Sequence, residues 1–520
     1  MRSLAGRQQA FSVFDYIIVG AGSAGCTLAH RLTEDPGARV LLLEAGGWDR
    51  HALIHIPLGF GKIVGGRFDW RYLTEPEPQA GGRRIENARG KVVGGSSSIN
   101  AMAHVRGHAS DYDRWAQSGL REWSYAHALP YLRRQETWEG GESVYRGGSG
   151  PIGVRKSVYR DPIIDAFEEA GLSLGHPHTD DYNGAQQEGF CTQQMTIRDG
   201  RRCSAATAYL RPALSRANLS VEVGALASRV LMEGSRAVGV EYLRRGETRQ
   251  VRANREVILA GGVINTPQIL MLSGIGDPDD LSAHGLKVAV PLRGVGKNLQ
   301  DHVAVGVIHA RKEPGPFHRM MRVDRLAVEL TKAHFAGTGL ATDLPTGGIA
   351  FLKSRPDAAV PDVQILSIAA PYNAHPYLSP FRRSYQDVLV LRAVLLRPES
   401  RGWLKLASAD PRSAVRIHAN ILTRDADWNT LRSGTRLLRD IARQPSLQRQ
   451  IGAEVGPALA SASNADIDAF IRATVVTFRH TLGTCRMGAA SDEEAVVDPE
   501  LKVRSVEGLR VVDASVMPDL

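Results

Sequence analysis

A glycine-rich motif near the N-terminus has the spacing that binds the diphosphate of a dinucleotide. Residues 20–25 read Gly-Ala-Gly-Ser-Ala-Gly, the G-x-G-x-x-G pattern. Its first glycine allows a tight turn, its second lets the backbone approach a pyrophosphate, and its third permits close packing of helix on strand. Glu44 follows about 20 residues later, where an acidic side chain accepts hydrogen bonds from ribose hydroxyls. The sequence therefore predicts a site for FAD or NAD, formed by Gly20, Gly22, Ser23, Ala24, Gly25, Glu44 and Ala45.

A strand, a helix and a second strand must surround this motif. An apolar run at 14–20 ends in glycine, an Ala- and Leu-bearing stretch covers 23–32, and another apolar run covers 40–44. This order is typical of a βαβ unit with buried parallel strands. Further strands are expected at 219–223, 237–242, 256–260 and 510–513.

Two more segments are rich in glycine and small residues. Residues 90–100 read Gly-Lys-Val-Val-Gly-Gly-Ser-Ser-Ser-Ile-Asn, which could donate backbone N–H groups to phosphate, wrap a planar ring or start a helix. Residues 261–276 join a strand end to a helix, with Pro267 near its first turn and Gly274 as its stop. Residues 261–276 could have a structural role only. The residues alone therefore do not decide the role of either segment.

Composition and charge exclude several classes of protein. The chain has 520 residues, 43% of them hydrophobic and 23% charged, which is typical of a globular protein with more than one core. The net charge is +9, but the basic pairs are scattered, so nucleic-acid binding is not expected. With no export signal and no run of about 18 apolar residues, we expect a cytoplasmic protein, with peripheral contact to the inner membrane as the alternative.

The cysteines and histidines do not predict a metal site. Two histidine pairs have the i,i+4 spacing that binds metal on a helix, but Pro57 and Gly107 argue against regular helix there, and no third ligand is in register. No two cysteines form a C-x-x-C pair, so a disulfide framework is not expected either. The residues concerned are His51 and His55, His104 and His108, and Cys26, Cys191, Cys203 and Cys485.

With the three glycine-bearing segments in this order, the sequence resembles the glucose-methanol-choline (GMC) oxidoreductase family. The family's two diagnostic motifs match residues 90–100 and 262–276, and further matches lie at 202–210, 294–302 and 511–518. Residues 73–78 and 194–198 look most like choline- and sorbose-type dehydrogenases. The resemblance covers 14–518 and implies an enzyme that binds FAD and oxidises alcohols.

The resemblance also implies roles for individual residues. The family's catalytic histidine matches His480, within residues 480–488, and Cys485 beside it is expected to be a packed small residue. Val93 and Gly95 fall in the first diagnostic motif. Asn100 and Ala101 are expected beside the isoalloxazine, Val230 near the adenine, and Asp513 and Ala514 near the pyrophosphate and ring edge.

The chemistry implied for His480 is that of a base. A primary alcohol, polyol or sugar loses a hydride from its α-carbon to flavin N5 and becomes an aldehyde or ketone. A neutral imidazole whose pKa lies near the working pH suits removal of the hydroxyl proton. The reduced flavin then needs an electron acceptor, and a quinone, another carrier or oxygen all stay open.

The sequence departs from the family pattern in two places. Ile99 stands where some choline-oxidising relatives carry a histidine covalently joined to the flavin, so we expect non-covalent FAD. The sequence ends at Asp519 and Leu520, where relatives continue through an Asn-Thr-Asn-like turn into a helix that supplies a second catalytic His or Asn. We therefore expect a truncated C-terminus and a chain that is a poor catalyst in this form.

The expected fold is α/β, with a Rossmann-like FAD-binding domain and an interleaved antiparallel-sheet substrate part of α+β type. The FAD-binding domain is expected over 14–302, with excursions near 46–89 and 150–200 that cover the substrate. Residues 303–464 form most of the substrate domain, and 465–520 return to the flavin. The alternatives to alcohol oxidation are a non-redox, hydroxynitrile-lyase-like member of the family and an impaired enzyme.

Overall fold

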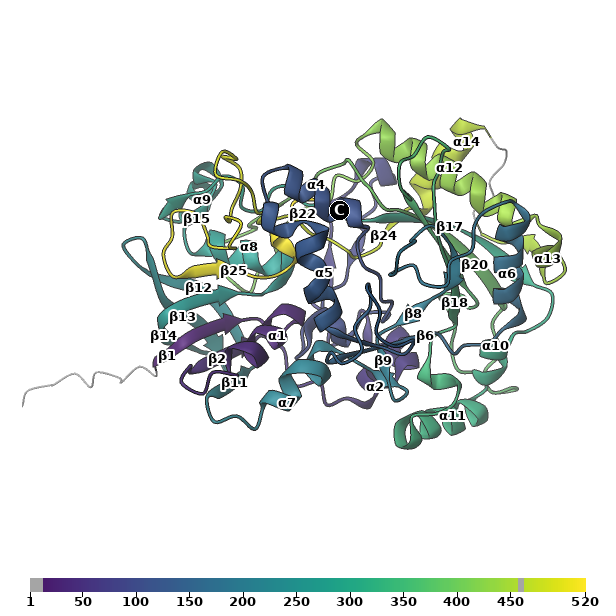
Figure 1. Ribbon diagram of the computed structural model, residues 1–520, viewed down its shortest axis with the longest axis horizontal. Helices are drawn as coiled ribbons and strands as arrows, with labels where there is room; N and C mark the ends of the chain where they lie inside the picture. The colour runs from purple at the N-terminus through teal and green to yellow at the C-terminus, as the bar shows by residue number, and fades with distance from the viewer. Residues whose placement is uncertain (1–12, 457–462) are drawn as a thin grey trace, which may run out of the picture.

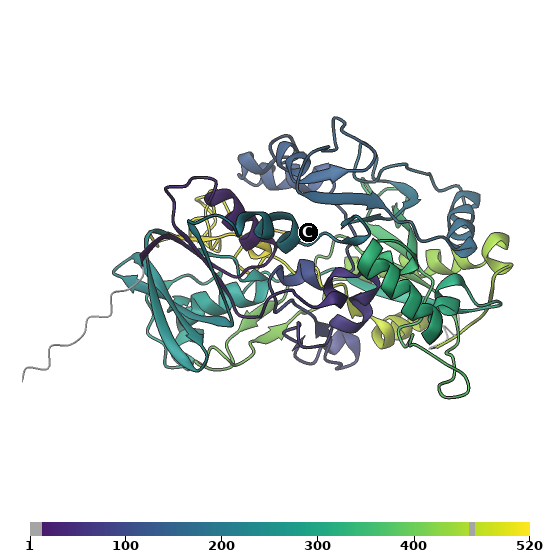
Figure 2. The same ribbon diagram turned by 90° about the horizontal axis from the view of Figure 1, so that it is seen from below.

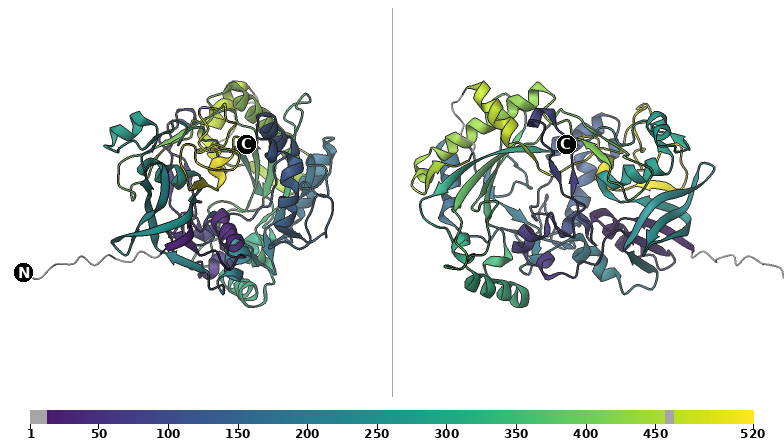
Figure 3. Two further views of the ribbon diagram at one scale, coloured as in Figure 1. Left: turned by 60° about the vertical axis from the view of Figure 1, so that its left-hand side comes forward. Right: turned by 180° about the vertical axis from the view of Figure 1, so that it is seen from behind.

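The computed structural model describes residues 13–456 and 463–520, which form two large sheets with a cavity between them. One sheet lies at the left of Figure 1 and the other at the right, and the view from behind in Figure 3 shows the same separation. Figure 2 shows the 46–89 segment, in dark purple, between the two. This arrangement confirms the predicted fold, a Rossmann-like domain combined with an antiparallel-sheet domain.

The first sheet contains the predicted βαβ unit. Its parallel part runs from β11 (Leu219–Val223) through β2 (Val40–Glu44) and β1 (Val13–Val19) to β14 (Glu247–Leu259). The five residues of β2 are all buried, as expected for a parallel strand covered on both faces. The helix between β1 and β2, α1 (Ser23–Leu32), has the predicted bounds.

β14 links the parallel part of this sheet to an antiparallel part. Its first half pairs with β13 (Arg236–Arg244), which pairs with β12 (Ala225–Glu233), and its second half pairs with β1 and β25 (Leu509–Val511). The carboxyl ends of β1, β2, β14 and β25 therefore meet at one edge of the sheet, which is where such folds bind ligands.

The second sheet is antiparallel. Its order is β23 (Ile451–Glu454), β17 (Val303–Arg311), β20 (Val388–Leu395), β19 (Val363–Ile368), β18 (Thr346–Leu352) and β7 (Gly189–Thr192), with β24 (Val476–Thr477) also on β17. Four helices of the described chain pack on its strands, α6 (Pro162–Ser173), α12 (Asp425–Ala442), α13 (Pro445–Gln448) and α14 (Asn464–Thr474), and they lie at the right of Figure 1. β7 comes from the 150–200 excursion, so this sheet draws on residues far outside 303–464.

The remaining elements of the described chain lie outside the two large sheets. In the parts of the chain that the structure describes, no helix is both long and apolar enough to cross a membrane. The helices are α2 (Ala52–His55), η1 (Pro57–Gly59), α3 (Phe60–Ile63), η2 (Pro78–Ala80), η3 (Gly95–Ser98), α4 (Ala109–Gln117), η4 (Arg121–Trp123), α5 (Tyr125–Arg134), η5 (Ala206–Leu210), α7 (Arg211–Ala213), α8 (Gly262–Leu272), α9 (Pro278–Ala283), α10 (Pro316–Met320), α11 (Val323–Ala336), η6 (Leu340–Thr342) and η7 (Ala514–Val516). The strands are β3 (Tyr72–Leu73), β4 (Glu86–Asn87), β5 (Glu136–Trp138), β6 (Ile152–Lys156), β8 (Gln194–Met195), β9 (Ile197–Arg198), β10 (Arg201–Arg202), β15 (Ile275–Gly276), β16 (Val290–Pro291), β21 (Trp403–Lys405) and β22 (Arg416–His418).

Helix α8 differs from its prediction at its N-terminal end. It begins at Gly262, so Pro267 lies inside the helix rather than in its first turn, while Gly274 follows with a φ of 80°. Proline has no N–H group, so the carbonyl of Val263, four residues earlier, lacks its usual helical partner. The hydroxyl of Thr484 donates to that carbonyl at 2.6 Å instead. This bond joins α8 to the segment that carries His480.

Candidate active site

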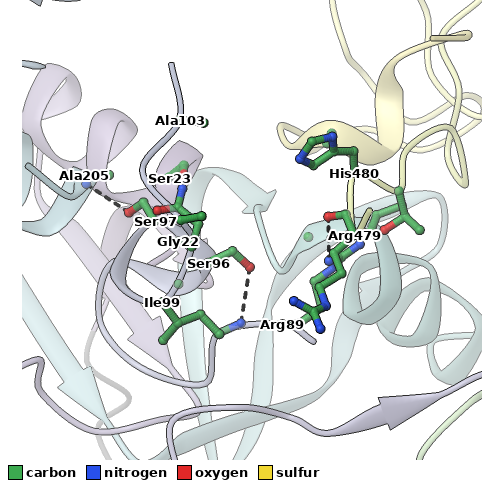
Figure 4. A pocket seen from close by; sticks show the side chains of 18 of the residues that line it. Gly22, Ser23, Arg89, Ser96, Ser97, Ile99, Ala103, Ala205, Arg479 and His480 are labelled. Atoms are coloured by element: carbon green, nitrogen blue, oxygen red, sulfur yellow. Dashed lines mark hydrogen bonds between the residues drawn. The ribbon is translucent and has the colours of Figure 1, made fainter. Parts of the chain in front are cut away.

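The cavity between the sheets has a volume of about 2490 Å³. Ligand pockets for single small molecules measure roughly 300–1,000 Å³, so this cavity has room for a dinucleotide and a substrate together. Figure 4 shows Gly22 and Ser23 on one side of it and His480 with Arg479 on the other. The carboxyl ends of the parallel strands open into it through Gly20, Glu44, Ala45, Ala260, Gly261, Val512 and Asp513.

The G-x-G-x-x-G turn is built as the motif requires. Gly20 has a φ of 102°, and a Cβ there would lie 2.5 Å from the carbonyl oxygen of Ala260. A Cβ on Gly25 would lie 1.8 Å from the carbonyl oxygen of Gly20, so Gly25 serves helix packing and does not line the cavity. Helix α1 has no side-chain cap at Gly22 and no acidic residue in its first turn. Its first N–H groups are therefore open to an anion from the cavity.

Glu44 is fixed at the end of β2. Its carboxylate accepts hydrogen bonds from the N–H groups of Ala21, at 2.9 Å, and Gly46, at 2.7 Å. Burial raises the pKa of Glu44 to about 7. Its place beside the glycine turn, with Ala45 next to it in the cavity wall, fits the ribose contact predicted for it.

The 90–100 segment closes over the start of α1. A Cβ on Gly95 would lie 2.7 Å from the Cα of Gly22, so the two glycine-rich segments touch. The hydroxyl of Ser97 accepts from the N–H of Ala205 at 3.0 Å, and that of Ser96 accepts from the N–H of Gly90 at 3.2 Å (Figure 4).

The end of this segment faces the cavity through Asn100 and Ala101. Arg202 donates to the side-chain oxygen of Asn100 at 2.8 Å and thereby orients that amide. Val93 is buried and does not line the cavity, and its N–H donates to the carbonyl of Gly47 at 2.9 Å.

Asp513 and Ala514 line the cavity at the start of α8. The carboxylate of Asp513 accepts from the N–H of Gly262 at 2.9 Å and from the hydroxyl of Thr266 at 2.6 Å. Val230, in contrast, lies outside the cavity wall, where its N–H donates to the hydroxyl of Ser273 at 2.8 Å. Apart from Val230, Val93 and Gly25, the structure brings all the predicted cofactor residues to the cavity.

His480 projects into the cavity from the opposite side (Figure 4). The backbone N–H of His480 donates to the carboxylate of Asp301 at 2.7 Å. Its Nδ1 lies 3.1 Å from Nδ1 of His302, with the two rings at 81°. Nε2 of His302 lies 3.0 Å from the carbonyl oxygen of Leu396.

These contacts determine where the imidazole protons lie. A carbonyl oxygen only accepts, so His302 carries its proton on Nε2, and its neutral ring has an unprotonated Nδ1. That nitrogen accepts a hydrogen bond from Nδ1–H of His480. A neutral His480 then has its lone pair on Nε2, which has no partner among the described residues.

Both histidines are held in the neutral form. Burial lowers the pKa of His302 to about 4. Enclosure by the cavity walls, together with His302, Arg89 and Arg479, lowers the pKa of His480 to about 3. Arg89 lies near this pair and donates to the carbonyl of Arg479 at 2.9 Å. An imidazole on the cavity wall with an unpaired Nε2 can accept a hydroxyl proton. Its pKa of about 3 lies well below the working pH, which differs from the value expected from the sequence.

The other histidine and cysteine positions have structural contacts. His51 and His108 accept hydrogen bonds from backbone N–H groups at the start of α2 and α4. Cys485 is fully buried, which raises its pKa well above the ordinary value for a thiol. Within 13–456 and 463–520, no three His, Cys, Asp or Glu side chains are grouped so that they could hold a metal ion.

Sequence reasoning missed Asp301 and His302. Both lie in the 294–302 segment, which matched the family but received no chemical role. A usable signal was the Asp-His pair at the end of that segment, directly before β17. The contact with His480 joins residues 178 positions apart, and no local pattern records it.

The comparisons with known proteins agree with this geometry. The GMC oxidoreductase family models match residues 14–304 and 398–520. Human mitochondrial choline dehydrogenase is 45% identical over 517 residues, which is 98% of this chain and 86% of that protein. The oxygen-dependent choline dehydrogenase of Brucella anthropi is 41% identical over 507 residues, 97% of this chain and 91% of its own length.

Solved structures give the same result. Pyridoxine 4-oxidase from Mesorbium loti superposes with a TM-score of 0.86 at 31% identity, covering 98% of this chain and 95% of the other. A variant of the FAD-containing formate oxidase of Aspergillus oryzae superposes with a TM-score of 0.89 at 27% identity, covering 98% and 94%. The resemblance seen in the sequence is confirmed: the chain belongs to the GMC oxidoreductase family and is an FAD-dependent oxidoreductase that acts on the CH–OH group of its donors.

Proposed function

We propose that this enzyme oxidises its alcohol by hydride transfer to the flavin while Nε2 of His480 accepts the hydroxyl proton. The observation that carries the proposal is the hydrogen-bond chain from Leu396 through His302 to His480. It leaves a lone pair on the one His480 nitrogen without a protein partner. That atom is where an alcohol hydroxyl needs an acceptor.

The cavity residues fit FAD. The open N–H groups at the start of α1 suit the pyrophosphate and Glu44 suits the ribose, while Asn100, Ala101 and Ala514 line the same cavity as His480 and would contact the ring system. Bound FAD supplies the hydride acceptor, N5. Val230 lies outside the cavity wall, so it is not among the residues proposed to contact the cofactor. Ile99, which offers no nucleophile in the cavity wall, supports a non-covalent flavin.

Proton transfer turns His480 into an imidazolium. Its Nδ1–H continues to donate to His302, which stays neutral because its own Nε2–H is committed to Leu396. The carboxylate of Asp301 is 2.7 Å from the backbone N–H of His480 and holds the residue in place. The same residues therefore fit both protonation states of His480, and no rearrangement is needed between them.

Bound FAD, once reduced, would need an electron acceptor. The names of the relatives, choline dehydrogenase and oxygen-dependent choline dehydrogenase, support a small alcohol as substrate and admit either a carrier or oxygen. We propose a quinone or another carrier, with oxygen as the variant to test. Stopped-flow reoxidation with a soluble quinone and with oxygen compares them directly.

Anaerobic reduction of the flavin tests the role of His480. In His480→Ala, reduction by alcohol is expected to slow by roughly 10² to 10⁴, the usual contribution of a positioned acid-base group. FAD content should be unchanged, since none of the cofactor contacts above uses His480. His334, an exposed histidine on α11 outside the cavity wall, provides the matched control, and the flavin of His334→Ala should be reduced at the parent rate. A His480→Ala enzyme that is reduced as fast as the parent would contradict the proposal.

A further inference from the structure

The second sheet presents one charged side chain to the cavity. Several residues on the described strands of this sheet line the cavity, and most are uncharged, such as Phe351, Leu366 and Ile368. Arg392 on β20 is the only charged residue of this set. Gly306 lies opposite Arg392 on β17, and a Cβ there would lie 3.2 Å from Cγ of Arg392. The glycine thus leaves room for the arginine stem against the sheet.

Arg392 has no anionic partner among the described residues. No carboxylate lies within ion-pair distance, and its guanidinium makes no hydrogen bond to a described residue. The guanidinium carbon lies 4.8 Å from the centroid of the Tyr372 ring. Burial, and the nearby positive charge of Arg479, lower the pKa of Arg392 to about 10, so it stays protonated at neutral pH.

Four carboxylates near or in the cavity walls have arginine partners. Glu86 pairs with Arg479 at 2.9 Å. Glu454, in a small cavity next to Arg392, lies 3.8 Å from Arg439. Asp111 and Asp519, elsewhere in the main cavity wall, both pair with Arg114, at 3.0 and 2.8 Å. The positive charge of Arg392 is therefore left without compensation from these groups.

A half-buried cation without a partner is costly, and an incoming anion removes that cost. The guanidinium fork matches the two oxygens of a carboxylate or phosphate. A quaternary ammonium would instead meet a like charge, and the Tyr372 ring, which could hold such a cation, already faces the guanidinium.

We propose that the alcohol oxidised by this enzyme carries an anionic group, a carboxylate or a phosphate, and that Arg392 binds it while the hydroxyl meets His480. The inference rests on the proposed function, because it takes the hydroxyl site from His480. It separates this chain from the choline dehydrogenases it resembles, whose named substrate is a cation. Arg392 is thus assigned as a residue that determines specificity.

The first experiment compares alcohols that differ mainly in charge. Anaerobic flavin reduction in the holoenzyme is measured with 6-hydroxyhexanoate, glycerol 3-phosphate, 1-hexanol and choline. We expect kcat/KM to be highest for one of the two anionic compounds, by at least about 10-fold, and the better of the two identifies carboxylate or phosphate. Choline or hexanol reducing the flavin at least as well as both anions would overturn the proposal.

The second experiment uses substitutions of the arginine. Arg392→Gln should lower kcat/KM for the anionic alcohol by about 10- to 100-fold and leave that for hexanol within about 2-fold, while Arg392→Lys should recover part of the loss. Arg382→Gln is the matched control, because it removes the same charge from a residue that is exposed and lies outside the cavity wall. Equal losses for hexanol and the anionic alcohol would show that Arg392 has a structural role only.

A binding measurement keeps the two proposals separable. Calorimetric titration of the unreacted holoenzyme with hexanoate, and with inorganic phosphate, should show one anion binding to the parent at least 10-fold more tightly than to Arg392→Gln. If no alcohol reduces the flavin but this difference is found, the hydride-transfer proposal fails and the anion site stands. If alcohols reduce the flavin and neither anion distinguishes the two proteins, the anion site is wrong.

Discussion

Replacing His302 tests whether this residue sets the tautomer of the base. His302→Leu removes both the acceptor for Nδ1–H of His480, at 3.1 Å, and the bond to the carbonyl of Leu396, at 3.0 Å. The His480 ring can then rotate or place its proton on Nε2, where it cannot act as a base. A hydrogen bond contributes about 0.5–1.5 kcal/mol net, which corresponds to roughly a 2- to 13-fold lower population of the productive form when it is lost.

The assay is anaerobic stopped-flow reduction of the flavin at saturating alcohol. The rate constant in His302→Leu should fall by roughly 2- to 13-fold, and His302→Asn should recover part of it because its side-chain oxygen can accept from Nδ1–H of His480. His318→Leu is the matched control: Nε2 of His318 also lies 3.0 Å from a carbonyl, that of Tyr385, but outside the cavity wall. If His302→Leu kept its FAD and its parent rate, or if His318→Leu slowed reduction equally, the tautomer argument would be refuted.

Two further predictions concern pH and the link between α8 and the catalytic segment. The pKa values of His302 and His480, about 4 and about 3, lie below the ordinary value of about 6.5. For His302, which is less exposed, the contribution to stability should be complete above about pH 6.5 and be lost as the pH falls toward 4. Neither residue should titrate near pH 6.5 in the free enzyme. If kcat/KM for flavin reduction changed sharply with pH near 6.5, His480 would be protonated at a higher pH than argued. Thr484→Val should leave the Val263 carbonyl without a donor and lower the free energy of unfolding by about 1–3 kcal/mol in denaturant titrations, whereas Thr331→Val, which removes a similar bond on the exposed face of α11, should change it by less than about 0.5 kcal/mol. Equal changes in the two variants would mean that the bond beneath Pro267 has no special importance.

The sequence by itself determined the local units of the nucleotide-binding domain. The bounds of α1 and β2 agree with the predicted ranges, because an apolar run, a glycine turn and a helical stretch interact mainly with their chain neighbours. The motif order also identified the family and the cofactor. His480 was found as a candidate by its position within a motif, without any knowledge of its surroundings.

Only the tertiary structure decided which distant residues meet. His302 reaches His480 because β17 and the 476–482 segment lie side by side, and Arg392 faces the cavity because alternate residues of β20 point to opposite faces of the sheet. The sequence shows that alternation but does not say which face is turned toward the flavin domain. That choice depends on how the second sheet packs, including the addition of β7 from a segment more than 100 residues earlier than most of the sheet. The position of the imidazole protons and the charge of the proposed substrate depend on such contacts, so they could be inferred only from the folded chain.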